Sequence, residues 1–365
     1  MTELLLGNHA CAKAAIAAGC RFFAGYPITP SSEIMEEMIR LLGEVGGVFI
    51  QMEDEIASLG ACIGASWCGR KAMTATSGPG YSLMQENIGF AYMTETPVVI
   101  VDIQRAGPST GQATRVGAGD IYQARYGAHG DYEAIALSPW NVEEMFTMTV
   151  RAFDLSEEFR VPITLLAEEA TGHLRETVTL PDVSRPSVRK KPPEGSPPWG
   201  NPNTAGMTPM PGFGQGLNLL VTGSTHTEFG YRKTQDGETQ RRLINRIVNK
   251  IRIRASSIWD AETHHIAGAT TVIVAYGFTA RAALAAVERA RAKGRKIGLL
   301  RLKTIWPFPD GIVRRYCLSA KRVVVPEMNA GMVVREVERA ARRDCVGFSK
   351  TMGEVITPAE IEELL

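Results

Sequence analysis

Long apolar runs and an excess of charge of either sign are both missing from this sequence of 365 residues. No apolar run approaches the roughly 20 residues that a membrane helix needs. The N-terminus also lacks the basic region and long apolar stretch of a secretory signal. Forty Lys and Arg residues against 39 Asp and Glu residues leave a net charge of +1, so no large uniform field attracts nucleic acid or an anionic membrane. We therefore expect a cytoplasmic protein that binds neither.

Paired cysteines are missing as well. The six cysteines stand at positions 11, 20, 62, 68, 317 and 345, and none of them forms a C-x-x-C pair. This spacing argues against a zinc site and against an iron–sulfur cluster held by this chain. We expect thiols in a reducing compartment and no metal site.

The sequence does contain an alternation of strands and helices over residues 1–180. Expected strands lie at 21–25, 47–50, 71–75, 97–101 and 161–166, and expected helices at 32–42, 53–64 and 83–93. Strands that alternate with helices predict a parallel sheet covered on both faces. Fold class is therefore α/β, and we assign residues 1–180 to the first domain.

A connector is expected over residues 181–265. Its first part, up to residue 215, is dense in Pro, Gly and Ser, which cannot sustain regular hydrogen bonding. A short strand is expected at 218–221 and an amphipathic helix near 238–253. Eight basic and two acidic residues lie in 232–254, and a solvated helix face or a subunit contact accounts for them better than nucleic acid does.

A second, smaller α/β domain is expected over residues 266–365. Strands at 271–275, 297–302 and 323–325 alternate with helices at 279–293 and 332–342. The first of these helices is followed by Gly294, a residue typical of a helix C-terminus.

Two polar loops follow the first two expected strands. The loop Gly25–Glu33 places the Thr29 hydroxyl between two prolines at the carboxyl end of a strand, where ligands bind in open α/β sheets. A plain helix cap would explain its serines equally well. The loop Gln51–Gly60 carries three consecutive acidic residues before a helix rich in small residues. These acids are either partners of the helix dipole or functional carboxyl groups.

Two further loops follow the next two strands. Thr76–Ser82 offers backbone amides between a strand and a helix, but it is neither a Walker loop nor a dinucleotide fingerprint. Gln104–Gln112 contains Arg105, whose planar guanidinium matches a carboxylate, although a surface ion pair is the alternative. Four such loops at equivalent strand ends point to one ligand site.

The motifs YPITPSSE, EDEIAS, TSGPG and QRAGPSTGQAT resemble, in this order, the α subunit of 2-oxoacid:ferredoxin oxidoreductases, most closely the 2-oxoglutarate branch. The resemblance continues through Thr225–Gly230, Thr304–Pro309 and Val325–Gly331, and so covers nearly the whole chain. It implies a thiamine-diphosphate enzyme with a pyrimidine-binding domain followed by a transketolase C-terminal-like domain.

The resemblance also implies roles for single residues. The glutamate at the position of Glu55 hydrogen-bonds a ring nitrogen of the aminopyrimidine, which makes the pyrimidine an internal base. Thr29 and Thr110 lie near the substrate, and Arg105 holds its C1 carboxylate. The loop of Ser77, Gly78, Pro79 and Gly80 lines the cofactor cavity. Glu55 and Thr29 are thus the expected catalytic residues.

Two departures from the family pattern imply partner subunits. The chain lacks a Gly-Asp-Gly signature followed by Asn-Asn, having only His129-Gly-Asp131, and it lacks a cysteine cluster. A β subunit is expected to supply the diphosphate site, Mg²⁺ and a [4Fe-4S] cluster, in an (αβ)2 assembly that passes electrons to ferredoxin. A coenzyme A domain found ahead of this region in some relatives is absent, so coenzyme A is expected to bind elsewhere.

Alternatives concern the substrate and the role of the chain. The implied reaction converts 2-oxoglutarate and coenzyme A to succinyl-CoA and CO2, but pyruvate or a branched-chain 2-oxoacid would undergo the same chemistry. The distal carboxylate of 2-oxoglutarate requires a second cation, for which Arg115, His129 or a lysine of a partner are candidates. A purely structural subunit is the remaining alternative.

Overall fold

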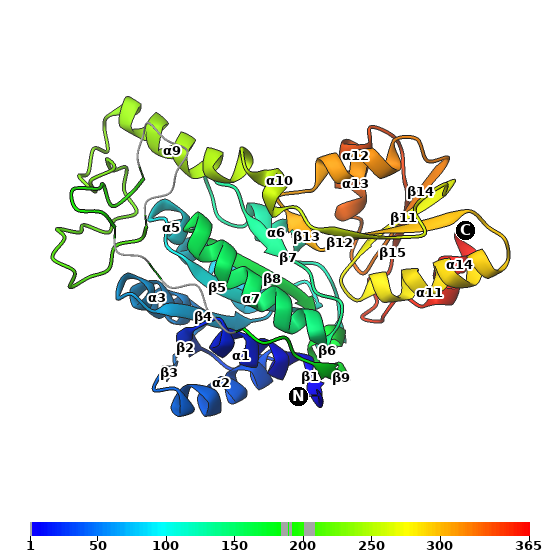
Figure 1. Cartoon of the computed structure of the whole chain (residues 1–365), viewed down its shortest axis with the longest axis horizontal. Coiled ribbons are helices and arrows are strands. Elements are labelled where there is room, and N and C mark those ends of the chain that lie inside the picture. The colour runs from blue at the N-terminus through cyan, green and yellow to red at the C-terminus, as the bar shows by residue number, and fades with distance from the viewer. Residues whose placement is uncertain (1, 184–188, 190–191, 201–208) are drawn as a thin grey trace.

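The computed structural model describes residues 2–183, 189, 192–200 and 209–365. These residues form two α/β units, each built around its own sheet, with a long helix and irregular loops beside the larger unit (Figure 1). The α/β fold with parallel sheets is confirmed. The domain boundaries expected at residues 180 and 266 stay a prediction.

The larger sheet has the strand order β13-β7-β8-β5-β4-β2-β3, and β6 pairs with β5 beside this path. Its strands are β2 (Cys20–Gly25), β3 (Val48–Gln51), β4 (Lys71–Thr76), β5 (Val98–Ala106), β6 (Gln112–Val116), β7 (Ile135–Leu137), β8 (Pro162–Glu168) and β13 (Thr304–Trp306). The strands from β7 to β3 are all parallel, whereas β13 and β6 are antiparallel to their neighbours. Each strand expected in residues 1–180 overlaps one of the parallel strands.

Helices cover both faces of this sheet. The elements of this unit outside the sheet are β1 (Thr2–Leu6), α1 (Gly7–Ala17), α2 (Ser32–Glu44), α3 (Glu55–Trp67), α4 (Gly78–Leu83), α5 (Gln85–Met93), α6 (Ile121–Tyr126), α7 (Val142–Phe159), α8 (Glu169–Gly172) and β9 (Arg175–Thr179). The chain runs from β2 through α2 to β3, and then back through α3 to β4. Because crossovers are right-handed, this reversal puts α2 and α3 on opposite faces. The helix expected at 83–93 starts later, as α5.

Beyond this unit the chain forms irregular segments and then α9 (Gly237–Arg252) and α10 (Ala255–Ile258). The strand expected at 218–221 is wrong, because these residues pair with no described strand. Leu219 and Val221 instead pack singly against the core. The basic side chains of α9 are also not all solvated: half-buried Arg246 and buried Lys250 form ion pairs with Glu95 of the larger unit.

The smaller sheet has the order β10-β12-β11-β14-β15, with only β10 antiparallel to its neighbour. Its elements are β10 (Ala261–His264), β11 (Thr271–Tyr276), α11 (Thr279–Ala292), β12 (Ile297–Leu302), α12 (Asp310–Cys317), β14 (Arg322–Glu327), α13 (Val333–Ala341), β15 (Val346–Ser349) and α14 (Pro358–Glu363). Figure 1 shows α11 and α14 on one side of this sheet and α12 and α13 on the other. The strands and helices expected here all form.

Hydrogen bonds hold the smaller unit against the larger one. Asn329 Nδ2 donates to the Ala118 carbonyl at 2.8 Å, and Tyr122 Oη donates to the Met332 carbonyl at 2.8 Å. The backbone N–H of Phe278 donates to the buried carboxyl of Glu168 at 3.2 Å. The smaller unit thus packs beside the carboxyl ends of β5 and β8. Among the described helices, none combines the length and apolar character needed to cross a membrane.

Candidate functional site

The four loops singled out in the sequence lie along one edge of the larger sheet. They follow β2, β3, β4 and β5, and the structure places these strands side by side in the order β5-β4-β2-β3. Because the strands are parallel, all four loops leave the sheet at its carboxyl edge. This is the edge at which open α/β sheets bind ligands.

Glu55 begins α3 at this edge. The preceding residue, Asp54, caps the helix by accepting a hydrogen bond from the N–H of Ala57 at 2.7 Å. Glu55 is only 4% exposed, and its carboxyl lies against Gly80 of the next loop. A methyl group at Gly80 would overlap both the Glu55 carboxyl and the Thr76 hydroxyl. Glycine at position 80 therefore lets these two polar groups converge.

Burial makes the Glu55 carboxyl a weaker acid than an exposed glutamate. Desolvation raises its pKa above the ordinary value, and the neighbouring charge of Asp54 raises it further. A carboxyl with a raised pKa keeps its proton more readily near neutral pH. It can then donate a hydrogen bond to a ring nitrogen rather than only accept one.

The loop from Ser77 to Gly80 leads from β4 into α4, with Pro79 in the first turn of that helix. The Ser77 hydroxyl is buried, and no hydrogen-bond partner for it occurs among the described residues. Gly78 lies against Asp120, because a Cβ at Gly78 would sit 3.2 Å and 3.3 Å from the two carboxyl oxygens. Each glycine of this loop thus contacts an acidic side chain.

Arg105 connects two of the other loops. It is 8% exposed, and its guanidinium donates to the carbonyl of Thr29 at 2.7 Å and to the carbonyl of Thr110 at 2.9 Å. The structure thus brings together three residues that the resemblance had placed near the substrate. Thr29 and Thr110 are themselves exposed at this edge.

A polar network that the sequence did not indicate holds the loop containing Thr29. Buried Asn8 donates to the Pro30 carbonyl and to Glu33, both at 2.9 Å. His173 approaches the other oxygen of Glu33 at 3.2 Å, and the hydrogen bond that its imidazole donates to the Glu169 carboxylate raises the pKa of His173. These residues come from α1, α2 and the end of α8, so only the fold brings them together.

Two further acids were missed at this edge, Asp102 in β5 and Asp120 just before α6. Asp102 is completely buried. A signal was available, because Asp102 interrupts the apolar run Val98–Ile103, and a charged residue inside a buried strand is rarely placed there by packing alone.

The edge fits an uncharged nitrogen heterocycle. Glu55 offers a protonated or ionised carboxyl, Ser77 an unpartnered buried hydroxyl, and the glycine loop a surface that a flat ring can approach. The same edge carries several acids and would repel a diphosphate. In the described ranges, no three His, Cys, Asp or Glu side chains are grouped so that they could hold a metal ion.

The two cations considered for a distal carboxylate lie in different places, and Arg115 directly precedes Val116, which pairs with Arg105. Arg115 is exposed on β6 and packs beside Gly353. His129 is exposed near Glu86, with 3.9 Å between Nδ1 and a carboxyl oxygen. His129 and Glu86 line a cavity of about 330 Å³ between α5 and α9. None of the expected catalytic, substrate-binding or cofactor-binding residues lines this cavity.

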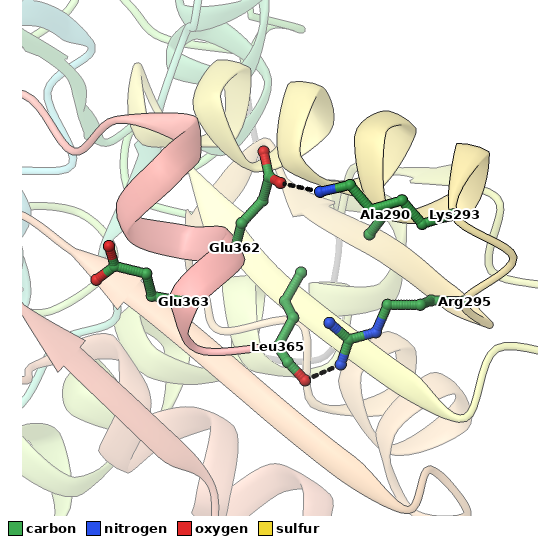
Figure 2. A pocket seen from close by; sticks show the side chains of 6 residues that line it. All are labelled: Ala290, Lys293, Arg295, Glu362, Glu363 and Leu365. Atoms are coloured by element: carbon green, nitrogen blue, oxygen red, sulfur yellow. Dashed lines mark hydrogen bonds and ion pairs between the residues drawn. The ribbon is translucent and has the colours of Figure 1, made fainter.

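A smaller hollow of about 230 Å³ lies in the C-terminal unit (Figure 2). Lys293 pairs with Glu362 across it at 3.0 Å, and Arg295 donates to the carbonyl of Leu365. Lys293, Glu362 and Arg295 are thus already paired within the chain, and none of the expected site residues lines this hollow.

Family models match most of the chain. The model described as "pyruvate flavodoxin/ferredoxin oxidoreductase, thiamine diP-binding" matches residues 13–246, and that of the "pyruvate:ferredoxin oxidoreductase core domain II" matches residues 269–361.

Curated relatives match over nearly their whole length. The 2-oxoglutarate synthase subunit KorA of Methanocaldococcus jannaschii is 52% identical over 99% of this chain and 98% of its own. The 2-oxoglutarate synthase subunit KorA of Archaeoglobus fulgidus is 44% identical over 100% of this chain and 98% of its own. The ketoisovalerate oxidoreductase subunit VorB of Methanothermobacter thermautotrophicus is 34% identical over 99% of this chain and 96% of its own.

Solved structures agree with this assignment. The 2-oxoglutarate:ferredoxin oxidoreductase from Magnetococcus marinus matches with a TM-score of 0.94 and 30% identity, covering all of this chain and 64% of that one. This chain therefore spans less than two thirds of that structure's chain. A split-gene transketolase matches with a TM-score of 0.53 at 12% identity, which shows the fold alone, over 94% of this chain and 89% of its own. The resemblance drawn from the loop motifs is confirmed.

Proposed function

This chain belongs to the pyruvate flavodoxin/ferredoxin oxidoreductase family, and we propose that it is the α subunit of a 2-oxoglutarate:ferredoxin oxidoreductase. The complete enzyme converts 2-oxoglutarate and coenzyme A to succinyl-CoA and CO2 and passes the electrons to ferredoxin. The observation that carries this proposal is the buried carboxyl of Glu55, which meets the glycine loop at the carboxyl edge of the larger sheet.

Glu55 and the Ser77–Gly80 loop are the residues proposed to hold the pyrimidine end of thiamine diphosphate. When bound, this cofactor supplies an electron sink for the bond that breaks as CO2 leaves. Glu55 holds a proton at its carboxyl for a ring nitrogen, which the raised pKa of this group favours. The buried Ser77 hydroxyl and the loop amides bind and orient the ring and exclude water from it.

Arg105, Thr29 and Thr110 are proposed to bind the oxoacid. Two nitrogens of Arg105 already donate to carbonyls, which fixes the plane of the guanidinium. Its remaining N–H groups are the donors proposed for the C1 carboxylate. The Thr29 hydroxyl lies at the carboxyl end of β2 and is proposed to contact the carbonyl end of the substrate.

A β subunit is proposed to complete the site. The acids along the edge disfavour a diphosphate, so Mg²⁺ and the diphosphate group are assigned to the partner, together with a [4Fe-4S] cluster that reduces ferredoxin. The relatives are named as subunits of larger enzymes. We propose an (αβ)2 assembly.

The proposed substrate is 2-oxoglutarate rather than a branched-chain oxoacid. Relatives named for 2-oxoglutarate are 44–52% identical to this chain, against 34% for those named for ketoisovalerate. His129 lines a cavity without the expected site residues, so Arg115, which adjoins the register partner of Arg105, or a lysine of a partner is the cation proposed for the distal carboxylate.

A substrate panel tests this proposal. The chain is co-expressed with its β subunit, and coenzyme A-dependent reduction of ferredoxin is measured with 2-oxoglutarate, pyruvate and 2-oxoisovalerate. We expect 2-oxoglutarate to give the highest kcat/KM by at least about tenfold, because the distal carboxylate gains a charged contact. A higher kcat/KM with either other oxoacid would contradict the assigned substrate.

The substrate role of Arg105 is tested by R105A. We expect the KM for 2-oxoglutarate to rise on the order of 100-fold, because a desolvated charged contact is lost. R70A is the matched control, since Arg70 is exposed. An unchanged KM in R105A would remove the clamp from the proposal.

A further inference from the structure

Asp102 and Asp120 form a buried acid pair that the proposed reaction does not use. Asp102 is completely buried in the middle of the larger sheet, whereas Asp120 is partly exposed as a residue but has a buried Oδ2. Within the part of the chain that the structure describes, no donor reaches either carboxyl oxygen of Asp102 or Oδ2 of Asp120. The charged group that acts on the Asp102 carboxyl is the carboxyl of Asp120.

Two facing carboxyl groups without a donor require a proton between them. Two adjacent negative charges in a low-dielectric interior repel strongly, and neither is hydrated. One shared proton turns this repulsion into a short hydrogen bond, as in other carboxyl dyads. Burial raises the pKa of Asp102 well above its ordinary value and that of Asp120 to about 6, in the direction that this geometry requires.

The pair lies directly behind the loop proposed to bind the cofactor. Asp120 contacts Gly78, the first glycine of that loop. Asp102 stands beside Thr76 in the register of β4 and β5, and neighbouring residues of parallel strands share a face. Thr76 in turn meets Glu55 at Gly80. The acid pair and Glu55 thus approach the same short loop from its two ends.

We propose that Asp102 and Asp120 share one proton and act as positioning residues that hold the Ser77–Gly80 loop in the conformation that binds the cofactor. Loss of the proton leaves two repelling carboxylates, one of them against Gly78, and the loop moves away. This inference rests on the proposed function only for the identity of the ligand.

The surroundings of the pair contain few other charges. Arg105, from the end of β5, is the cation that acts on Asp120. Tyr81 of α4 lies near both acids, and burial raises its pKa above the range in question. The backbone N–H of Asp120 donates to the Gln104 amide oxygen at 3.1 Å, which fixes the start of α6. Glu55, whose pKa burial also raises, is the other titratable group at this loop, and D102N and D120N leave it unchanged.

Thiamine diphosphate affinity as a function of pH tests the proposal. Wild type, D102N and D120N, each co-purified with the β subunit, are titrated with thiamine diphosphate and Mg²⁺ between pH 6.5 and 8.5. An asparagine amide donates without needing a proton, so both variants keep the internal hydrogen bond. We expect the wild-type Kd to rise with pH, by up to about tenfold for each pKa unit by which binding shifts the shared proton, and the Kd of both variants to rise less than that of wild type. D154N, at an exposed position of α7, is expected to follow wild type. A parallel rise in all four proteins would overturn the proposal.

Urea unfolding of the same proteins, without cofactor, separates the acid pair from the proposed function. A raised pKa in the folded state means that the pair stabilises the fold most at low pH and loses this contribution as pH rises through the folded value. The stability of wild type relative to D102N is therefore expected to fall as pH rises. A pH-independent difference would contradict the shared proton. If the difference falls as expected but neither wild type nor D154N binds thiamine diphosphate, the pair is supported and the proposed function is contradicted.

Discussion

Two groups of buried acids in this chain have opposite electrostatic surroundings. Glu95, which follows α5, is 2% exposed, with Arg246 at 2.8 Å and Lys250 at 3.0 Å. Burial alone would raise its pKa, but Lys250, Arg246 and Arg160 lower it far below the ordinary value. At the carboxyl edge of the sheet, no cation among the described residues pairs with Glu55 or Asp102, and burial raises the pKa of both.

This difference distinguishes an acid whose charge is compensated by buried cations from acids whose pKa is raised by burial. Glu95 attaches α9 to the larger unit, and its charge is fully compensated. The edge acids keep the unfavourable free energy of burial, which folding alone gives no reason to retain. Raised pKa values without a cation partner are common at functional sites. Each of the following variants tests one side of this comparison.

The largest effect is expected for E55Q. Glutamine cannot exchange a proton with a ring nitrogen, so kcat should fall on the order of 10³-fold, within the range typical of lost acid–base catalysis. Ferredoxin reduction by the complex with the β subunit measures it. E53Q is the matched control, because Glu53 is exposed two residues away. Unchanged turnover in E55Q would favour the alternative of a purely structural subunit.

The next effect is expected for E95Q, on stability rather than on turnover per folded molecule. Removing this charge leaves Lys250 and Arg246 buried without compensation, which should lower the free energy of unfolding by about 3 kcal/mol. Urea unfolding at pH 7 measures it, with R241A as the control on the exposed face of α9. Because the pKa of Glu95 is lowered in the folded state, the deficit should shrink as pH falls below about 4. A deficit that is independent of pH would contradict the ion-pair explanation.

For E168Q we expect a smaller effect on the free energy of unfolding, with a pH dependence opposite to that of E95Q. Burial raises the pKa of Glu168 to about 7. Its carboxyl accepts a hydrogen bond from the backbone N–H of Phe278 in the smaller unit. Its contribution to stability is present at low pH and is lost as pH rises toward 7, so wild type should lose about 2 kcal/mol relative to E168Q between pH 5 and pH 8. Unfolding midpoints across this range measure the slope. A slope of the reverse sign would place Glu168 with Glu95 rather than with the edge acids.

Local patterns in the sequence predicted the strands, the loops at their ends and the family. They succeeded because the apolar runs of β2, β4, β5 and β8 and the loops that follow them are each contained in a short stretch of chain. The prediction of a strand at 218–221 was wrong because it, too, used local pattern alone. Its apolar residues look like a strand locally, but a strand needs a partner that no local pattern reveals.

The electrostatic partners could not be predicted because they are distant in the chain. Lys250 lies 155 residues from Glu95, and Phe278 lies 110 residues from Glu168. Arg105 was expected to bind a carboxylate, but its contacts with the Thr29 and Thr110 carbonyls depend on two loops meeting in space. Asp102 was also missed, although its place inside an apolar strand is visible in the sequence.

The central claim is that Glu55 meets the pyrimidine ring of a cofactor whose diphosphate is bound by another chain. The most direct test is a structure of the complex with the β subunit, thiamine diphosphate and Mg²⁺. The account predicts a ring nitrogen about 2.6–3.2 Å from a carboxyl oxygen of Glu55, with the ring against Ser77–Gly80 and the diphosphate on the β subunit. A ring bound elsewhere, for example in the cavity between α5 and α9, would contradict it.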